Sequence, residues 1–268
     1  MKAFNFHEVK SVKEATKLAS NKSTFLAGGM TLIPSMKMRL SSFSDVIDIK
    51  EIKELYGIKV KGKSVIIGAN TKHADVAASK EVRKALHSLA GLAEGIGDPQ
   101  VRNCGTLGGS ISNNDPTACY PSACIALDAI IHTSSRKVEA EKFFTGMFET
   151  SLKKSELVTA VEFQIPEKSC YIKFPNPASR YAMVGVYIAK FKKEVRCAVT
   201  GAQSVVYRCK EIEKALNNNF SESALDSVSL KSSNLNSDIH ASAEYRASLI
   251  VRTKSSSWLK VVILRTII

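Results

Sequence analysis

The order of apolar and polar positions predicts a small α/β unit over residues 1–57. Short apolar stretches typical of strands alternate there with stretches whose apolar residues recur every three or four positions, as on one face of a helix. In chain order, the expected elements are a strand over 3–9, a helix opening at the capping box Ser11 to Glu14, a strand over 24–27, a helix over 31–40 and a strand over 45–49. This β-α-β-α-β order indicates a first subdomain with a short sheet.

Residues 58–168 have the pattern of a second subdomain that mixes helices with short strands. Glycines punctuate its centre, between residues 95 and 109, and we expect this part to be rich in turns. The elements expected around the centre are a strand over 64–69, helices over 71–78 and 79–93, a helix running into a strand over 121–131, and short strands over 136–165 with a turn near Thr145 and Gly146.

Prolines between residues 166 and 177 mark the boundary of a C-terminal domain over residues 169–268. Two apolar runs beyond them, at 183–191 and 195–200, predict two or three antiparallel strands. Helices are expected over 211–216, 221–225 and 240–251. The ending, 252–268, finishes in VVILRTII, and its pattern suggests no function. The fold class expected for the whole chain is α+β.

The composition is that of a globular protein and narrows its partners. The chain has 268 residues, of which 44% are apolar, and a formal net charge of +13. Its basic residues are scattered and few aromatic residues lie among them, so a solvated surface or a face for an acidic protein is favoured over nucleic-acid binding. No apolar run reaches the roughly 20 residues needed to span a bilayer, and no signal peptide is evident. We therefore expect a cytoplasmic protein without a membrane span.

The reactive residue types do not form a recognisable catalytic or metal-binding set. Cys119 and Cys124 have the spacing that opens a plant-type iron–sulfur signature, but the third cysteine of that signature is missing. GxGxxG, GxxxxGK[ST], HExxH and GxSxG motifs are absent. His240 and Glu244 stand four residues apart and could share a metal, although a surface pair is the commoner arrangement. We predict no metal site and no catalytic side chain.

Two glycine segments offer the clearest candidate chemistry. Residues 25–32 read FLAGGMTL, and residues 105–116 read GTLGGSISNNDP. Glycine lets a ligand approach the main chain closely, and successive amides in such turns form a concave site for anions. Two segments of this kind could hold a diphosphate from both sides, which points to a dinucleotide cofactor. The alternatives are a simple strand-to-helix turn for the first segment and a tight loop for the second.

Two further side chains have open interpretations. Lys173 could offer its charge to a phosphate or a flavin edge, or it could be an ordinary exposed lysine. Tyr181 could stack on a flat ring, or it could be a core tyrosine.

Longer stretches extend these motifs across the chain and carry a family resemblance. They are LAGGMTLIPSMKMRL at 26–40, GIGDPQVRNCGTLGGSISNNDPTACYPSA at 95–123, FFTGMFET at 143–150, PASRYAMVGV at 177–186 and LNSDIHASAEYRASLI at 235–250. With them the chain resembles the FAD-binding middle subunit of molybdenum hydroxylases, of the aerobic carbon monoxide dehydrogenase type. It is similar also to the flavin domain of xanthine dehydrogenases.

The resemblance implies a fold and a set of cofactor-binding residues. Residues 1–57 and 58–168 would be the two subdomains of a vanillyl-alcohol-oxidase-type FAD-binding fold, and residues 169–268 a domain of a three-stranded sheet packed with helices. FAD would be bound non-covalently, with its diphosphate between the glycine segments. The residues implied to bind it are Ala27, Gly28, Gly29, Met30, Thr31, Leu32, Ile96, Thr106, Gly108, Gly109, Asn113, Asp115, Val158, Thr159 and Lys173.

The resemblance also implies a function and partners. A large subunit with a molybdenum cofactor and a small subunit with [2Fe–2S] clusters would join this chain in a dimer of heterotrimers. Electrons from the clusters would reach FAD here and leave for an external acceptor.

Two departures from the family pattern motivate a second hypothesis. Cys119 stands where many relatives have an acidic residue before Tyr-Pro, and the segment from Arg252 onward does not follow the usual ending. The alternative is a non-catalytic assembly or interaction subunit that keeps the fold but binds flavin weakly.

Overall fold

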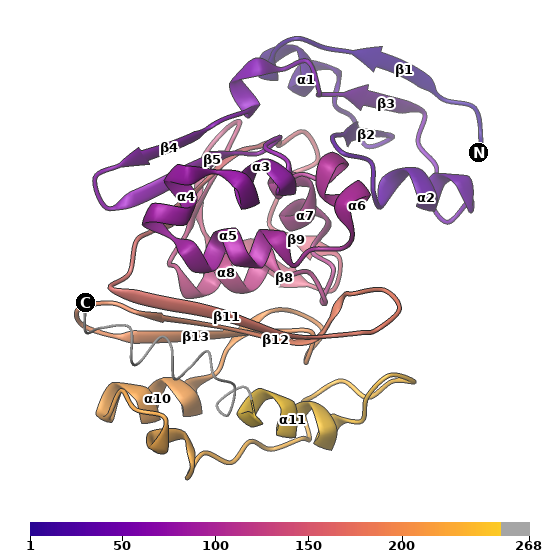
Figure 1. Cartoon of the computed structure of the whole chain (residues 1–268). Coiled ribbons are helices and arrows are strands. Elements are labelled where there is room, and N and C mark those ends of the chain that lie inside the picture. Colours follow the sequence, from indigo (N-terminus) through magenta and orange to yellow (C-terminus); the bar gives the residue numbers. More distant parts are fainter. Residues whose placement is uncertain (253–268) are drawn as a thin grey trace.

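The computed structural model describes residues 1–252, and three main sheets built from successive stretches organise them (Figure 1). The first sheet is parallel, with the strand order β1-β3-β2. Its strands and connecting helices are β1 (Asn5–Glu8), α1 (Val12–Leu18), β2 (Ser23–Leu26), α2 (Leu32–Lys37) and β3 (Asp45–Asp48), followed by the 3₁₀ turn η1 (Lys53–Leu55). The predicted β-α-β-α-β order of elements is confirmed.

The capping box predicted at the start of α1 is present. The Ser11 hydroxyl accepts from the Glu14 amide at 3.2 Å, and the Glu14 carboxylate accepts in return from the amide of Lys10 at 3.0 Å. The returning bond therefore reaches one residue further back than in the standard pattern.

The second sheet is antiparallel, in the order β4-β5-β10-β6-β7. Its strands are β4 (Ile58–Lys61), β5 (Ser64–Gly68), β6 (Ile130–Thr133), β7 (Lys137–Glu139) and β10 (Val158–Gln164). Apolar side chains that alternate along β5 and β10, such as Val65, Ile67, Val161 and Phe163, are fully buried in a core shared with the neighbouring helices. Those helices are α3 (His73–Ala78), α4 (Lys80–Ala85), α5 (His87–Glu94), α6 (Pro99–Cys104), α7 (Leu107–Asn113), α8 (Tyr120–Ala126) and α9 (Ala140–Phe143), and a small hairpin of β8 (Phe144–Gly146) and β9 (Glu149–Thr150) follows.

The second stretch differs from the prediction in three places, one of which is the short helix α9 within a range predicted as strands. The helix predicted over 79–93 is broken at Leu86, whose φ of −143° and ψ of 66° are not helical. The glycine-rich centre, expected to be turns, contains the helices α6 and α7. Each starts with a side-chain cap, because Asp98 accepts from the Val101 amide at 2.8 Å and Thr106 from the Gly109 amide at 3.1 Å.

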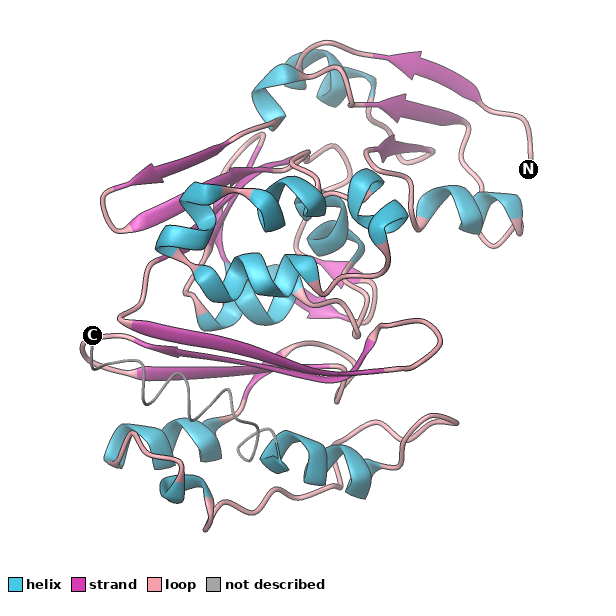
Figure 2. Cartoon of the chain, viewed as in Figure 1, coloured by secondary structure: helices cyan, strands magenta, loops and turns pink. Residues whose placement is uncertain are grey.

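The third sheet lies between two layers of helices (Figures 1 and 2). It is antiparallel and consists of β11 (Lys168–Pro175), β12 (Ala182–Lys190), β13 (Val195–Thr200) and β14 (Tyr207–Arg208). Along β12, Tyr187 and Ala189 point into the core shared with α5 and α8, whereas Val184, Val186 and Ile188 point to the opposite side. That side is covered by α10 (Lys210–Asn218), the 3₁₀ turn η2 (Ser223–Leu225) and α11 (Ala243–Arg252).

The number of strands in this sheet corrects the expectation of three. The strand β11 lies where the prolines had predicted a domain boundary. Pro175 does not interrupt this strand, because it is the last residue and need not donate a hydrogen bond to the neighbouring strand. In the described part of the chain, no helix is long and apolar enough to cross a membrane. The apolar ending VVILRTII lies outside the described residues.

Candidate functional site

The two glycine segments touch each other at Gly28. A Cβ atom built on Gly28 would lie 2.2 Å from the carbonyl oxygen of Cys104 and 2.9 Å from the Cα atom of Gly105. Only glycine permits so close an approach of two main chains. The first and second segments therefore form one continuous surface.

The second segment is fixed to the end of β5 by main-chain hydrogen bonds. The Gly108 amide donates to the Ala69 carbonyl at 2.7 Å, and the Leu107 amide donates to the Thr71 carbonyl at 3.1 Å. A Cβ atom on Gly108 would lie 2.6 Å from that of Ala69. Gly108 is thus needed for packing the segment onto the strand behind it.

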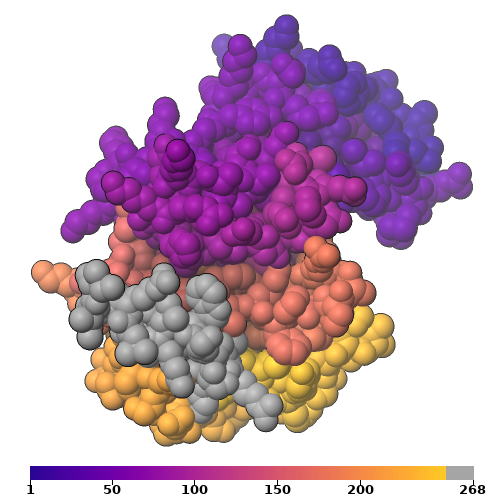
Figure 3. Space-filling view, in the orientation of Figure 1, coloured from indigo at the N-terminus to yellow at the C-terminus, as the bar shows by residue number. Residues whose placement is uncertain are grey.

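The joined segments form the middle of a cavity of about 510 Å³, a size typical of small-molecule sites. Its lining comes from three stretches, within residues 24–43, 73–119 and 173–181. In the space-filling view, the middle part of the chain lies between its N-terminal and C-terminal parts (Figure 3).

Most of the residues predicted to bind a cofactor are brought together in this cavity. Its lining includes Ala27, Gly28, Gly29, Met30, Thr31, Leu32, Ile96, Thr106, Gly109, Asn113, Asp115 and Lys173. Gly108, Val158 and Thr159 are not among the lining residues. Val158 is 2% exposed within the core, and the Thr159 carbonyl accepts from the Ala69 amide at 2.9 Å. These two residues lie in β10, one layer behind the second segment.

Backbone amides of the first glycine segment are free to donate hydrogen bonds to a ligand. Within the described chain, the backbone amides of residues 27–32 donate to no other group. Gly29 has a φ of +71°, a left-handed conformation that favours glycine, and its carbonyl accepts from the Ile33 amide at 3.0 Å. The carbonyl is thereby used inside the protein while the amides stay available, an arrangement that suits an anionic group.

Lys173 forms the C-terminal wall and holds three elements together. Its ammonium group donates to the carbonyls of Gly95 at 2.5 Å and Arg180 at 3.0 Å, and it lies 3.7 Å from the Cys119 sulfur. Lys173 comes from β11, whereas Gly95 and Cys119 belong to the helical layer. The thiol at position 119, which departs from the family pattern, therefore faces a lysine in the cavity wall.

Of the two alternatives for Tyr181, the structure favours a residue of the cavity over a residue of the core. Its side chain lines the cavity and is 47% exposed, which excludes a core role. Partial burial raises the pKa of Tyr181, and the nearby Asp115 and Cys119 raise it further. The phenol is therefore protonated at neutral pH, and it offers a flat ring and a hydrogen-bond donor.

His73 lines the cavity but was not anticipated from the sequence. Its side chain is 4% exposed, and it opens α3 directly beside the second glycine segment. Burial lowers the pKa of His73 to about 4, and the positive charge of Arg102 contributes to the same shift. Nothing in the local pattern marks this histidine, because it reads as an ordinary first-turn residue of a short helix.

The charged groups of the lining are Asp115, Lys173 and Arg180, and the remainder are mainly glycine, hydroxyl and apolar residues. Such a lining suits the binding of an anionic molecule that carries rings. His240 and Glu244 do not form a pair, because His240 precedes α11 and contacts Asn176 at 3.2 Å, while Glu244 accepts from Ser232 at 3.2 Å. In the described residues, no three acidic, histidine or cysteine side chains gather as metal ligands would.

Known proteins match both the sequence and the fold. The family described as the FAD binding domain in molybdopterin dehydrogenase matches residues 2–167. The glyceraldehyde dehydrogenase medium chain of Sulfolobus acidocaldarius is 35% identical over 92% of this chain and 94% of its own. The nicotine 6-hydroxylase medium subunit of Paenarthrobacter nicotinovorans is 32% identical over 92% and 93%. A structure of Hydrogenophaga pseudoflava carbon monoxide dehydrogenase lacking the Mo-pyranopterin moiety of its cofactor superimposes with a TM-score of 0.88, at 30% identity and 98% coverage of both chains.

Proposed function

This chain belongs to the family of FAD-binding domains of molybdopterin dehydrogenases, as an FAD-dependent oxidoreductase component, and we propose that it is an electron-transfer subunit. It would take electrons from [2Fe–2S] clusters of a partner subunit and pass them to an external acceptor. FAD, when bound, supplies the redox chemistry, and the protein supplies binding and orientation.

The observation that carries the proposal is the joined pair of glycine segments. The free amides of residues 27–32 and the close contact at Gly28 leave a concave, donor-rich surface that fits a diphosphate. We propose that this surface, with Thr106 and Gly109, holds the diphosphate of FAD. Ile96, Asn113, Asp115 and Lys173 would line the rest of the cofactor, in keeping with their place in the cavity.

In this proposal Gly108, Val158 and Thr159 would support the site without contacting the cofactor. Gly108 would serve by letting the second segment pack on Ala69. Val158 and Thr159 would support the adenine or flavin end only through β10, since they lie behind the lining. No side chain of this chain would exchange a proton with a substrate, because substrate oxidation would take place in another subunit.

Partner subunits complete the proposed enzyme. The similar proteins are called medium chain or medium subunit, which supports an assembly with a large molybdenum-cofactor subunit and a small [2Fe–2S] subunit. We propose a dimer of such heterotrimers in the cytoplasm, where the six free cysteines would stay reduced. Within the chain, residues 1–57 and 58–168 would form a vanillyl-alcohol-oxidase-type cofactor unit, and residues 169–268 would close it.

The direct test is a flavin titration of the isolated chain. The purified protein should be yellow and release FAD on denaturation, and the stripped protein should rebind FAD with a dissociation constant of about 1 µM or tighter. Riboflavin, which lacks the diphosphate, serves as the control and should bind more weakly than FAD. A folded, colourless protein that fails to take up added FAD would instead support the assembly or interaction subunit that Cys119 had suggested.

A further inference from the structure

An unsatisfied histidine lies in the wall of the cavity. Within the described chain, the Nδ1 atom of His73 is buried and has no hydrogen-bond partner. A neutral imidazole carries one donor and one acceptor, and leaving a buried polar group unpaired costs about 1–3 kcal/mol. A side chain that is 4% exposed does not recover this cost from bulk water.

The surroundings hold the ring in place without satisfying it. The His73 amide donates to the Gly105 carbonyl at 3.0 Å, and the neighbouring Lys72 pairs with Thr106 in a β-bridge. The ring lies 5.4 Å from that of Tyr120. A Cβ atom on residue 105 would lie 2.7 Å from Nε2, so the glycine there makes room for the imidazole. A phenylalanine would fill this space without an unpaired nitrogen, so packing alone does not account for a histidine.

We propose that His73 is a further cofactor-binding residue, whose imidazole hydrogen-bonds the anionic diphosphate held between the glycine segments. This inference rests on the proposed function, because FAD supplies the diphosphate. It places a third element, the start of α3, beside the two glycine segments.

The charges around His73 determine the protonation state of its ring and therefore its role in hydrogen bonding. The charged or titratable groups that face it are Arg102 of α6, whose positive charge acts on the ring, and Tyr120 of α8, whose pKa is raised by burial so that the phenol keeps its proton at neutral pH. Since burial and Arg102 keep the pKa of His73 near 4, the ring is neutral at pH 7 and acts as a hydrogen-bond donor. An adjacent diphosphate opposes the effect of Arg102, so its binding raises the pKa of His73.

The experiment compares the full-length His73→Phe variant with the wild-type chain. Both are stripped of cofactor and titrated with FAD, ADP and riboflavin. His73→Phe keeps the ring packing and removes both nitrogens, so the expected result is a roughly ten- to hundred-fold loss of affinity for FAD and ADP. Riboflavin, which lacks phosphate, should bind both proteins equally. His87→Phe, at an exposed position outside the cavity, is the matched control and should bind FAD like wild type.

Stability separates binding from a structural role. The apo form of His73→Phe should melt no lower than wild type, because an unsatisfied polar group has been removed, and His73→Gln should regain part of the lost FAD affinity. Equal affinity of wild type and His73→Phe for FAD and ADP would overturn the inference. If His73→Phe does not fold, NMR of the wild-type histidine rings decides instead, since an unperturbed His73 signal on addition of ADP would also overturn it. Wild-type protein that binds no FAD at all would refute the proposed function itself.

Discussion

The carbonyl oxygen of Cys104 faces Gly28 so closely that a Cβ atom on Gly28 would lie 2.2 Å away. The contact joins a turn of the N-terminal sheet to the helical layer of the second sheet. Both the shape of the cavity and the position of its free amides depend on it.

Gly28→Ala should therefore open the joined segments. The added methyl group forces the main chains apart, and overpacking of this kind costs about 1–3 kcal/mol. We expect FAD affinity to fall at least about ten-fold and the apo protein to melt earlier, as measured by flavin titration and thermal unfolding. Gly91→Ala is the matched control, because Gly91 lies in α5 with no atom within 4 Å of an added Cβ, and it should be neutral or slightly stabilising. Unaltered FAD binding by Gly28→Ala would show that the contact is not needed.

Lys173→Met should weaken the junction between the C-terminal domain and the cavity. The Gly95 and Arg180 carbonyls lose a charged donor, and hydrogen bonds to charged groups contribute about 1.5–3 kcal/mol. We expect a lower melting temperature and weaker FAD binding. Lys61→Met, at an exposed position on the edge strand β4, should change neither quantity. The prediction is contradicted if the two variants behave alike.

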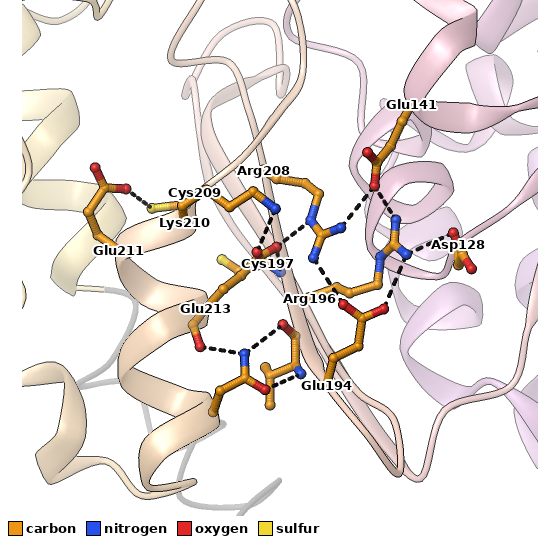
Figure 4. Close-up of polar contacts among 12 residues, drawn as sticks. Asp128, Glu141, Glu194, Arg196, Cys197, Arg208, Cys209, Lys210, Glu211 and Glu213 are labelled. Carbon is orange, nitrogen blue, oxygen red and sulfur yellow. Dashed lines mark hydrogen bonds and ion pairs between the residues drawn. The ribbon is translucent and has the colours of Figure 1, made fainter.

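A second junction between the domains should respond asymmetrically to mutation. Arg196 of β13 is 5% exposed and pairs with Asp128 at 2.8 Å, with Glu194 at 3.4 Å and with Glu141, which also contacts Arg208 (Figure 4). Its carboxylate partners are about half exposed. Removing them leaves a buried charge with too few partners, whereas removing the arginine leaves carboxylates that water can solvate.

The double variant Asp128→Asn/Glu141→Gln should consequently destabilise the chain more than Arg196→Met. We expect a loss of about 2–4 kcal/mol for the former and about 1 kcal/mol for the latter in urea unfolding. The reverse order would mean that packing of the arginine stem, and not its charge, stabilises the junction.

Acid should remove a contribution made by Glu156. Burial alone would raise the pKa of this carboxyl, but hydrogen bonds from Arg136, Thr133, the Lys153 amide and Ser135 lower it to about 2. Because the folded-state pKa lies below the ordinary value of 4.5, the stabilisation is complete above pH 4.5 and is lost as the pH falls towards 2. Its side chain is 2% exposed, so the contribution is about 3 kcal/mol at neutral pH.

Glu156→Gln should be less stable than wild type at pH 7, and the difference should shrink towards pH 2. Unfolding curves at several pH values measure it. Glu139→Gln provides the comparison, since Glu139 pairs with Lys142 on the surface and is 61% exposed. A pH-independent gap between Glu156→Gln and wild type would argue against the ionised carboxylate as its source.

The sequence predicted those helices and strands that are determined by neighbouring residues in the chain. The first subdomain was readable because polar and apolar residues alternate around the first strand, the next two strands contain short apolar runs, and Ser11 marks the first helix. The helices α6 and α7 were hidden by the glycines at 105, 108 and 109, although Asp98 and Thr106 are capping residues that could have revealed them. The glycines are there for close contacts between segments, which no local pattern shows.

The sequence predicted only those residues of the cavity that belong to recognisable motifs. The glycine segments and Lys173 were found from their sequence and family resemblance, and they do line the cavity. His73 was missed because its role arises from what surrounds it: a glycine at 105, a ring at Tyr120 and, among the described residues, no partner for Nδ1. Tyr181 was left undecided because exposure depends on how β11 and β12 pack.

The lining of the cavity draws on three stretches that adjoin three different sheets. A molecule seated there touches all of them, and by thermodynamic linkage its presence disfavours every state in which any one of the three has come away. The free energy of unfolding should thus rise with the concentration of free coenzyme, by about 2.7 kcal/mol at a hundred times the dissociation constant. The protein should then resist heat and proteases better. A cell short of riboflavin would, on this account, hold less of the polypeptide as well as less of its activity.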